Sequence, residues 1–456
     1  MAGIGFELRK ILRRDNLRSL LKAYTLAAIL GSGPWILSMV GIVVIGLLSY
    51  GVAGPATVLA QYQTSIKYVI ALSLVFTGAF QLAFTRFTAD RMFEARFNAI
   101  VPNYHGVALA VTVIGGLAGL AGAFLLFQEQ STAYRILLVA SFVVVSNIWI
   151  ATVFLAGLKQ YKEIVWLYTL GYGVTLVASM MLRRHGLEGL MAGFLLGQAI
   201  LLTGMLTLIL RSFPSEDLLS FEFFNRRSTH LSLAMIGLFY NLGVWADKFI
   251  FWYTPTLGQQ VIGPFNASLI YDLPAFLAYL SIIPGMAVFL LRMETDFVEH
   301  YEKFYDSVRT GGSLETIHKH RNRMVLIVRT GIFELIKVQT VTTLLLFIGG
   351  ETLLNWMGIS PLNLPLLYVR LTGAALHVVF LAILNVFFYL DKRLIALWLC
   401  LALAIMNTAF TEISLILGPA YYGYGFAVAM AVVVLTGMLV LSWKLDELEY
   451  ETFMLQ

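Results

Sequence analysis

The chain has 456 residues, of which 59% are hydrophobic and only 12% are charged, and its mean hydropathy is +0.81. Soluble globular proteins contain about 25% charged residues, so this composition excludes a soluble domain and indicates an integral membrane protein. The single cysteine, Cys400, excludes an intramolecular disulfide bond. The formal net charge of +5 does not indicate nucleic-acid binding, because the basic residues lie in short segments between long apolar runs.

The chain begins with a basic, amphipathic arm, residues 1–22. On a helix its apolar face would comprise Ile4, Leu8, Ile11 and Leu12, and its basic face Arg9, Lys10, Arg13, Arg14 and Arg18. Segments of this kind lie on anionic membrane surfaces, and we expect the same here. The apolar run that follows is much longer than the roughly 7–15-residue core of a signal peptide, so it predicts a retained transmembrane helix.

Twelve apolar runs are long enough to cross a membrane as helices, which takes about 20 residues. Pro274 and Pro284 should bend the eighth run, because proline removes a helical hydrogen bond. The expected spans are residues 23–48, 64–85, 104–127, 135–157, 164–182, 189–210, 231–252, 265–291, 326–349, 364–390, 394–417 and 423–443.

Most of the 31 Lys and Arg residues lie on one side of these spans. They occupy the N-terminal arm, residues 86–96, 159–162, 211–227, 292–323 and 392–393, and Lys444. The loops of the opposite side hold only Arg135, Arg183 and Arg184. Because basic loops remain in the cytoplasm, both termini are expected there.

The spans form two halves with the same layout. Six-helix lobes are expected at residues 23–211 and 231–443, joined by a cytoplasmic linker at 212–230 and followed by a cytoplasmic tail at 444–456. In each half the longest loop, 86–103 or 292–325, follows the second span. An even number of spans per half gives a parallel repeat about an axis along the membrane normal. The predicted fold is an all-α membrane protein with twelve transmembrane helices in two lobes.

Two Gly-x-Trp triplets, Gly33-Pro-Trp35 and Gly243-Val-Trp245, lie in the first helix of each half. Hydrophobic segments interrupted by Gly or Pro at corresponding places in two halves indicate the binding site of a transporter. The predicted helix breaks or hinges are Gly31, Gly33, Pro34, Gly243, Pro274 and Pro284.

Charged residues inside the spans are costly and are therefore candidates for a functional site. Asp247, Asp272 and Glu412 are expected in the outer half of the membrane. The alternative for Asp247 and Lys248 is that they only satisfy neighbouring helices. For Lys248 and Arg370 another alternative is a side chain that reaches out to the interface. Glu334 and Lys337, three residues apart, are expected to pair.

Aromatic residues complete the predicted substrate pathway. Trp35, Tyr240 and Trp245 are deep in their spans, where their rings could stack on sugars. Packing between helices is an equal alternative. The predicted pathway residues are Asp247, Lys248, Asp272, Glu412, Trp35, Tyr240, Trp245 and Arg370.

The loop at 292–325 favours a solvated helical hairpin, with Ser313 as a helix N-cap, over a surface that docks a partner. His318 and His320 have no third ligand nearby, so no metal site is predicted. The sequence contains no phosphate-binding loop and no dinucleotide-binding unit, so neither a cofactor nor an enzymatic activity is expected. A membrane glycosyltransferase or polymerase, and a structural scaffold of a synthase complex, are the alternatives to a transporter.

Four stretches together resemble a known family. They are Met1-Ala-Gly-Ile-Gly-Phe-Glu-Leu-Arg-Lys10, Gly243-Val-Trp-Ala-Asp-Lys-Phe-Ile-Phe-Trp252, Tyr271-Asp-Leu-Pro274 with Ile283-Pro-Gly285 and Glu294-Thr295, and Asn385-Val-Phe-Phe-Tyr-Leu-Asp-Lys-Arg393. In them, and over its whole length, the chain resembles the PelG family. These are inner-membrane transporters of Pel exopolysaccharide systems, within the MOP (multidrug/oligosaccharidyl-lipid/polysaccharide) exporter superfamily.

The resemblance implies a flippase-like fold with two lobes around a central cavity, lined by the first and seventh helices. It implies export of a polysaccharide across the bacterial inner membrane during synthesis of the biofilm matrix, with a partly deacetylated, cationic amino-sugar polymer as cargo. It also implies partners: a cytosolic glycosyltransferase and membrane scaffold proteins, one of which binds cyclic-di-GMP.

Overall fold

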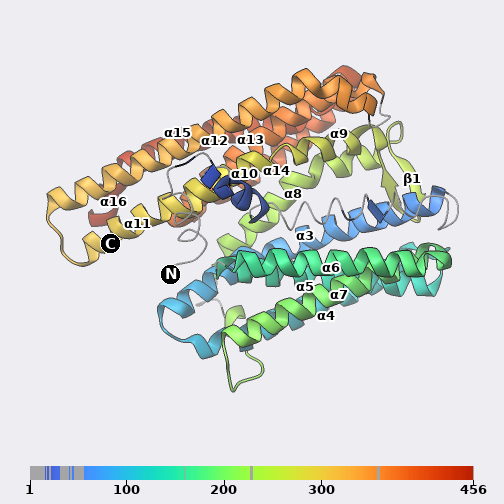
Figure 1. Cartoon of the computed structure of the whole chain (residues 1–456), viewed down its shortest axis with the longest axis horizontal. Helices are drawn as coiled ribbons and strands as arrows, with labels where there is room; N and C mark the ends of the chain where they lie inside the picture. Colours follow the sequence, from blue (N-terminus) through green and yellow to red (C-terminus); the bar gives the residue numbers. More distant parts are fainter. Residues whose placement is uncertain are drawn as a thin grey trace. The chain divides into compact units, whose positions relative to one another are not determined.

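The computed structural model describes residues 16, 18–19, 22–30, 41, 44–45, 56–158, 160–225, 230–356 and 360–454. The chain divides into two compact units (Figure 1). The first unit comprises Gly33–Leu269, and the second unit comprises Met1–Ser32 together with Ile270–Gln456.

The first unit is built from long helices and ends in a small β-hairpin. Short 3₁₀ turns at Phe97–Ala99, Arg183–His185 and Glu222–Phe224 connect or follow some of these helices. The elements are α3 (Ala56–Phe93), α4 (Ile100–Leu126), α5 (Thr132–Gly157), α6 (Tyr161–Leu182), α7 (Gly186–Ser212), α8 (Leu231–Tyr253), β1 (Gln259–Ile262) and β2 (Phe265–Ala267).

Helix α8 belongs to the first unit, in which it packs along α3. The linker before it is also held there, because the Ser220 backbone N–H donates to the Pro102 carbonyl at 3.0 Å and that of Phe223 to Asn103 Oδ1 at 2.9 Å. The boundary between the two packed units therefore lies after Leu269. This is one helix later than the boundary expected in the linker at 212–230.

Glycines set how closely these helices approach. A Cβ atom on Gly237 of α8 would overlap the carbonyl oxygen of Gly78 on α3, and one on Gly78 would lie 2.6 Å from the Gly237 carbonyl oxygen. Likewise, Cβ atoms on Gly193 and Gly197 of α7 would overlap Ser179 and Thr175 of α6. Small residues let membrane helices pack backbone to backbone, and both contacts depend on this.

The β-hairpin was not expected from the sequence. Its strands pair antiparallel, and Tyr68 of α3 holds it: the Tyr68 hydroxyl donates to the Asn266 carbonyl at 3.0 Å and accepts from the Asn266 N–H at 3.2 Å. The Tyr68 ring also stacks on Phe265, with the ring centroids 3.9 Å apart. The segment between α8 and α9 is therefore a fixed part of the first unit.

The second unit consists of helices that are interrupted more often. A π-helical turn, η4 (Arg292–Phe297), joins α10 to α11, and 3₁₀ turns at Pro361–Asn363 and Pro419–Tyr421 precede α13 and α15. The helices are α9 (Leu269–Leu280), α10 (Ile283–Leu291), α11 (Val298–Arg309), α12 (Leu314–Trp356), α13 (Leu364–Tyr389), α14 (Arg393–Leu417), α15 (Tyr424–Asp446) and α16 (Leu448–Met454).

Proline divides the eighth expected span into α9 and α10. Helix α9 continues through Pro274, whereas α10 carries Pro284 in its first turn. Helix α9 ends at Leu280 because Pro284 has no N–H to donate to the Leu280 carbonyl, four residues earlier, and its ring would clash with that carbonyl. The Ser281 carbonyl at the break accepts a hydrogen bond from Gln339 Nε2 at 3.1 Å. The bend predicted at Pro284 is confirmed.

Helices α11 and α12 form the hairpin expected at 292–325 (Figure 1). Gly311 adopts a φ of +69° in the turn, and the Thr316 N–H donates to Ser313 Oγ at 3.3 Å, which confirms Ser313 as the N-cap. At 43 residues, α12 is about 65 Å long, twice the roughly 30 Å of a bilayer core. About half of this helix must extend beyond the membrane.

The expected tail at 444–456 is largely helical. Helix α15 continues to Asp446, and α16 then packs back against the hairpin. Glu449 accepts a hydrogen bond from His318 Nδ1 at 2.7 Å, and Arg321 Nη2 donates to the Asp446 carbonyl at 2.8 Å. The C-terminal helix and the hairpin therefore share one end of the second unit.

The expected spans agree with the helices of the described ranges. Ten helical stretches there are long and apolar enough to cross a membrane, and one of them, Lys162–Ser212, contains both α6 and α7. Each expected span from 64–85 onward therefore has a helical counterpart. The first span, 23–48, lies largely outside the described residues; its described residues, 23–30, 41 and 44–45, are helical.

Candidate functional site

The Asp247–Lys248 pair lies on the buried face of α8, in the C-terminal third of this helix. Asp247 is fully buried, and its Oδ1 is 3.5 Å from Lys248 Nζ. Lys248 also donates to the Val244 carbonyl at 2.9 Å, and its ammonium lies 5.2 Å from the centroid of the Trp245 ring. Lys248 therefore does not reach out to the membrane interface. Its charge is kept beside Asp247 inside the protein.

Helix α8 is continuous through Gly243. The interruption expected at this glycine is thus absent, because a glycine within an otherwise apolar helix leaves the backbone hydrogen bonds in place. The close approach of α8 to α3 lies at Gly237 instead. Gly31, Gly33, Pro34 and Trp35 lie outside the described residues.

Other aromatic rings lie around Trp245, next to the charged pair on α8. Trp245 lies 6.3 Å from both Phe249 and Trp252, measured between ring centroids. Trp252 is fully buried against Tyr68, whose ring centroid is 4.7 Å away. Trp245 is half-buried, and Tyr240 also has intermediate exposure. Packing between helices accounts for Trp252, while stacking on a sugar stays a prediction for Trp245 and Tyr240.

Arg370 occupies a buried aromatic cage in the second unit. Only 1% of its surface is exposed, and its Nη1 donates to the Tyr271 hydroxyl at 2.9 Å. The guanidinium carbon lies 4.7 Å from the ring centroid of Phe426 and 5.9 Å from that of Tyr279. Arginine is suited to such a site because its planar cation stacks on rings. Arg370 therefore joins α9, α13 and α15 and does not extend to the interface.

The two remaining predicted carboxylates have different surroundings. Asp272 is half-buried and adjoins Tyr271, the hydrogen-bond partner of Arg370. Glu412 is exposed on α14. The buried residues of that helix near Glu412 are Asn407, Thr411 and Ser414. Trp245, Asp247 and Lys248, three of the predicted pathway residues, lie together on α8.

The charges near the π-helical turn do not pair as expected. Glu334 accepts two hydrogen bonds from Arg292, at 2.6 Å from Nε and 3.0 Å from Nη2, and Arg292 also donates to Asp296 at 2.7 Å. Lys337 lies 4.2 Å from the Phe333 ring centroid instead. The predicted Glu334–Lys337 pair is therefore wrong, because a guanidinium from another element supplies a bidentate partner that spacing along one helix does not reveal.

A second polar contact joins the π-helical turn to α13. Asn385 Nδ2 of α13 donates to Glu294 Oε1 of the π-helical turn at 2.7 Å. Both residues belong to stretches that carry the family resemblance. The sequence identified the two stretches separately, but nothing in their spacing indicated that they touch.

The described residues contain no group of three or more His, Cys, Asp or Glu side chains placed to hold a metal ion. His318 pairs with Glu449 and belongs to the contact between α12 and α16.

Comparison with known sequences identifies one family over nearly the whole chain. The profile of PelG, described as an exopolysaccharide exporter (EPS-E), matches residues 1–453. No curated protein matches the sequence.

Several solved membrane transporters have a similar fold. A MATE family multidrug resistance transporter of the MOP superfamily, in an outward-facing conformation, aligns with a TM-score of 0.65 at 14% identity, over 93% of this chain and 96% of that chain. A MOP superfamily transporter from Pyrococcus furiosus aligns with a TM-score of 0.61 at 13% identity, over 93% and 96%. A MATE protein in the straight conformation aligns with a TM-score of 0.60 at 14% identity, over 92% and 96%. At such low identity the likeness concerns the fold.

Proposed function

Because the chain belongs to the PelG family of exopolysaccharide exporters, we propose that it exports a cationic amino-sugar polymer and that Asp247 lies on the path of this cargo. Family and fold are those of a transporter, so the alternative of a membrane glycosyltransferase or polymerase is set aside. The positive charge of the polymer is inferred from the family resemblance and from the buried Asp247 carboxylate on α8.

The observation that supports this proposal is the burial of opposite charges inside a membrane helix. Buried ionisable residues in membrane spans are costly and mark functional sites by default. An ammonium group on a sugar gains Coulomb energy near a carboxylate, and this gain grows as water is excluded. Lys248, 3.5 Å from Asp247, weakens the attraction and so keeps a passing cation from being trapped.

The proposal is tested by isosteric neutralisation of the three candidate carboxylates. We expect Asp247→Asn to reduce secreted polymer at least 10-fold at equal membrane abundance, with a smaller effect of Asp272→Asn. Glu412→Gln should have the smallest effect of the three, because the Glu412 side chain is exposed on α14. Polymer is quantified in the medium of cells whose only copy of the gene is the variant.

Two results would overturn the role of Asp247. If Asp247→Asn lowers membrane abundance as much as secretion, the carboxylate is a structural partner of Lys248. If the triple variant secretes normally, the cationic path does not include these residues. A rescue of Asp247→Asn by Asp247→Glu would support the requirement for charge.

We also propose that the protein resides in the bacterial inner membrane with both termini in the cytoplasm. The positive-inside distribution supports this orientation, as does the location of α16 and the α11–α12 hairpin at one end of the second unit. Single cysteines placed at Gly312 and Gln456 of a Cys400→Ser background should be shielded from an impermeant thiol reagent in intact cells. Labelling at either position in intact cells contradicts the orientation.

The family resemblance further supports partners from a Pel-type synthase: a cytosolic glycosyltransferase and membrane scaffold proteins, one of them binding cyclic-di-GMP. The part of α12 that extends beyond the membrane offers them a surface outside the bilayer. Affinity purification from mild detergent should recover these proteins with the wild-type chain. Recovery of none of them, while the exporter remains folded, contradicts a stable complex.

A further inference from the structure

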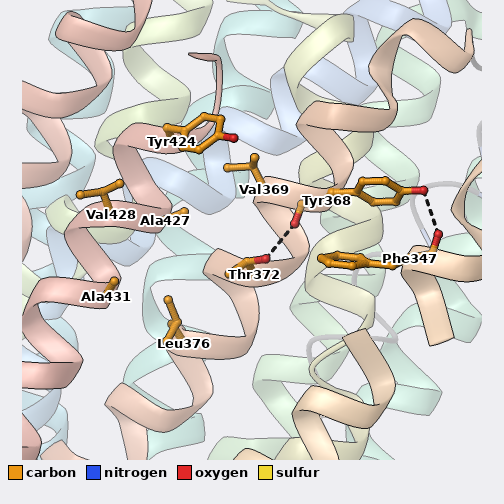
Figure 2. Close-up of a pocket in the computed structure, with 9 residues that line it drawn as sticks. All are labelled: Phe347, Tyr368, Val369, Thr372, Leu376, Tyr424, Ala427, Val428 and Ala431. Atoms are coloured by element: carbon orange, nitrogen blue, oxygen red, sulfur yellow. Dashed lines mark hydrogen bonds between the residues drawn. The ribbon is translucent and has the colours of Figure 1, made fainter. Parts of the chain in front are cut away.

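The second unit contains an apolar groove that no proposed transport step uses (Figure 2). It lies along α13 between α15 and α12 and has a volume of about 340 Å³. Its lining consists of Phe347 of α12, Tyr368, Val369, Thr372 and Leu376 of α13, and Tyr424, Ala427, Val428 and Ala431 of α15.

The groove exists because small side chains face larger ones. Ala427 and Ala431 recur at a spacing of one helical turn, so that α15 presents two methyl groups to the α13 side of the groove. In Figure 2 both alanines face the groove, and the Phe347 and Tyr368 rings lie on its other side. The two small side chains of α15 therefore contribute to the groove.

The polar atoms in the walls are occupied by the protein itself. Thr372 Oγ1 donates to the Tyr368 carbonyl at 3.0 Å, and the Tyr368 hydroxyl donates to the Phe347 carbonyl at 2.8 Å. Both bonds are drawn in Figure 2. No charged side chain lines the groove. Its occupant must therefore be uncharged and apolar where it touches the walls, apart from the Tyr424 hydroxyl near one end.

The depth of the groove matches one leaflet of a membrane. Tyr424 is the first residue of α15, and its ring contacts Tyr421 at a centroid distance of 6.2 Å; such aromatic pairs are typical of the membrane–water interface. Ala431 lies about 10 Å further along the helix, within the 15 Å or so of half a bilayer core. The groove thus starts at an interface and follows the acyl region of one leaflet.

The surface around the groove is the membrane-facing surface of the same helices. Val428, on the rim, is 42% exposed, and further along α15 Leu435 is 63% exposed. Ile348 of α12, next to Phe347 in sequence, is 84% exposed. Exposed apolar side chains on membrane-spanning helices indicate contact with lipid, and the groove is continuous with this surface.

We propose that the groove binds one acyl chain of a phospholipid, in the leaflet at the α12–α13 turn, with the headgroup beside Tyr424. Lipid tails and apolar side chains are alike in polarity, so burial from water contributes little to the affinity. The gain comes from dispersion contacts that an empty void would forgo. The bound chain packs α12, α13 and α15 together as an integral part of the second unit.

The test uses the full-length protein in nanodiscs that contain a phosphatidylethanolamine with a diazirine midway along one acyl chain. After photolysis, we expect labelled peptides to be concentrated at least 5-fold on the groove segments of α13 and α15 over other lipid-facing segments. Ala431→Phe, which fills the groove, should reduce this labelling at least 5-fold. Ala409→Phe, at an exposed position of α14 away from the groove, is the matched control and should leave the labelling unchanged.

Three outcomes would overturn the proposal. Equal labelling of all lipid-facing helices means that the groove holds only exchanging bulk lipid. Undiminished labelling in both Ala431→Phe and Val428→Phe, each eluting as folded protein, means that the label enters elsewhere. Displacement of the labelled lipid by an equimolar polyprenyl phosphate, but not by unlabelled phosphatidylethanolamine, assigns the groove to an isoprenoid chain.

Discussion

The pair of Arg292 and Glu334 illustrates how a half-buried cation selects its partner by geometry. The fork of Arg292 matches both oxygens of this carboxylate, whereas Lys337, on the same helix as Glu334, lies over the ring of Phe333. Bidentate guanidinium–carboxylate pairs are stronger than single contacts of an ammonium group. The acidic residue is therefore important to the packing of α12 against η4, and its basic neighbour along the helix is not.

We expect Glu334→Gln to lower the free energy of unfolding by about 1–2 kcal/mol, because Arg292 loses an ionic partner while keeping Asp296. Lys337→Met should change it by less than about 0.5 kcal/mol. Thermal unfolding in detergent, followed by tryptophan fluorescence, distinguishes the two variants. A loss of stability in Lys337→Met equal to that of Glu334→Gln would contradict the pairing.

The sequence identified individual site residues where the energetic cost of placing them inside a membrane could be estimated. A charge inside an apolar run is visible in the sequence, which is why Asp247 and Arg370 were candidates. Their partners come from other helices, or from neighbours whose side chains point the same way. The sequence did not indicate that the Tyr271 and Phe426 rings contact Arg370. Aromatic residues are common in membrane spans, and most of them only pack against other helices.

At the scale of the helix, close packing depends on the positions at which a side chain is absent. Gly237 and Gly78 bring the backbones of α8 and α3 together, and a methyl group on Gly237 would overlap the Gly78 carbonyl oxygen. We expect Gly237→Ala to destabilise the first unit by about 1–3 kcal/mol through this overlap. Lower membrane abundance and a lower melting temperature would show it.

Gly173→Ala is the matched control for this prediction. Gly173 lies within α6, and a Cβ atom there would have no other atom within 4 Å. Alanine is preferred over glycine inside a helix by about 0.5–1 kcal/mol, so this variant should be at least as stable as the wild type. Equal stability of both variants would show that α8 can move away from α3 without cost.

Besides Glu449, a second carboxylate, Glu451, attaches the C-terminal helix α16 to the second unit. Glu451 is 2.7 Å from Lys392 Nζ and 2.8 Å from Lys444 Nζ. Burial by itself would raise the pKa of Glu451, but the two lysines outweigh it and hold the pKa below its ordinary value of 4.5. The carboxylate therefore stabilises the folded state at neutral pH.

The lowered pKa of Glu451 predicts that the stability of the folded state depends on pH. Because the folded pKa lies below the unfolded one, the stabilisation is fully present above about pH 4.5 and is lost as the pH falls through the folded value. We expect Glu451→Gln to lower the unfolding free energy by about 1–2 kcal/mol at pH 7. The difference from the wild type should shrink below pH 4.5. A difference that persists unchanged at pH 3 would show that α16 is attached by other contacts.

Helices were predicted well where their apolar length decided the outcome. The hydropathy of each run predicted that a helix is present, and Ser313 and Pro284 predicted helix boundaries that the structure confirms. The extensions of α3 and α12 beyond the apolar runs could not be seen, because their charged residues are typical of solvated loops as well as of solvated helices. The β-hairpin at 259–267 was missed because its short strands adjoin a longer apolar run.

For the whole molecule, the sequence indicated a two-part transporter, and the family match and the fold of its structural relatives agree. The division between the parts was harder to predict. Hydropathy treats α8 as the first helix of a second half, whereas its contacts with α3 place it in the first unit. Such a contact depends on Gly78 and Gly237 meeting across 159 positions of the chain, which periodicity within one helix does not reveal.

The length of α12 has a mechanical consequence. A continuous helix of about 65 Å resists bending over its few dozen residues, so it transmits a rotation from one end to the other as a lever does. If its membrane-embedded half tilts by about 10°, the turn at Gly311–Ser313 sweeps roughly 6–11 Å, depending on the pivot. A dye on Gly312 would then report, from outside the bilayer, a motion that begins among the apolar side chains within it.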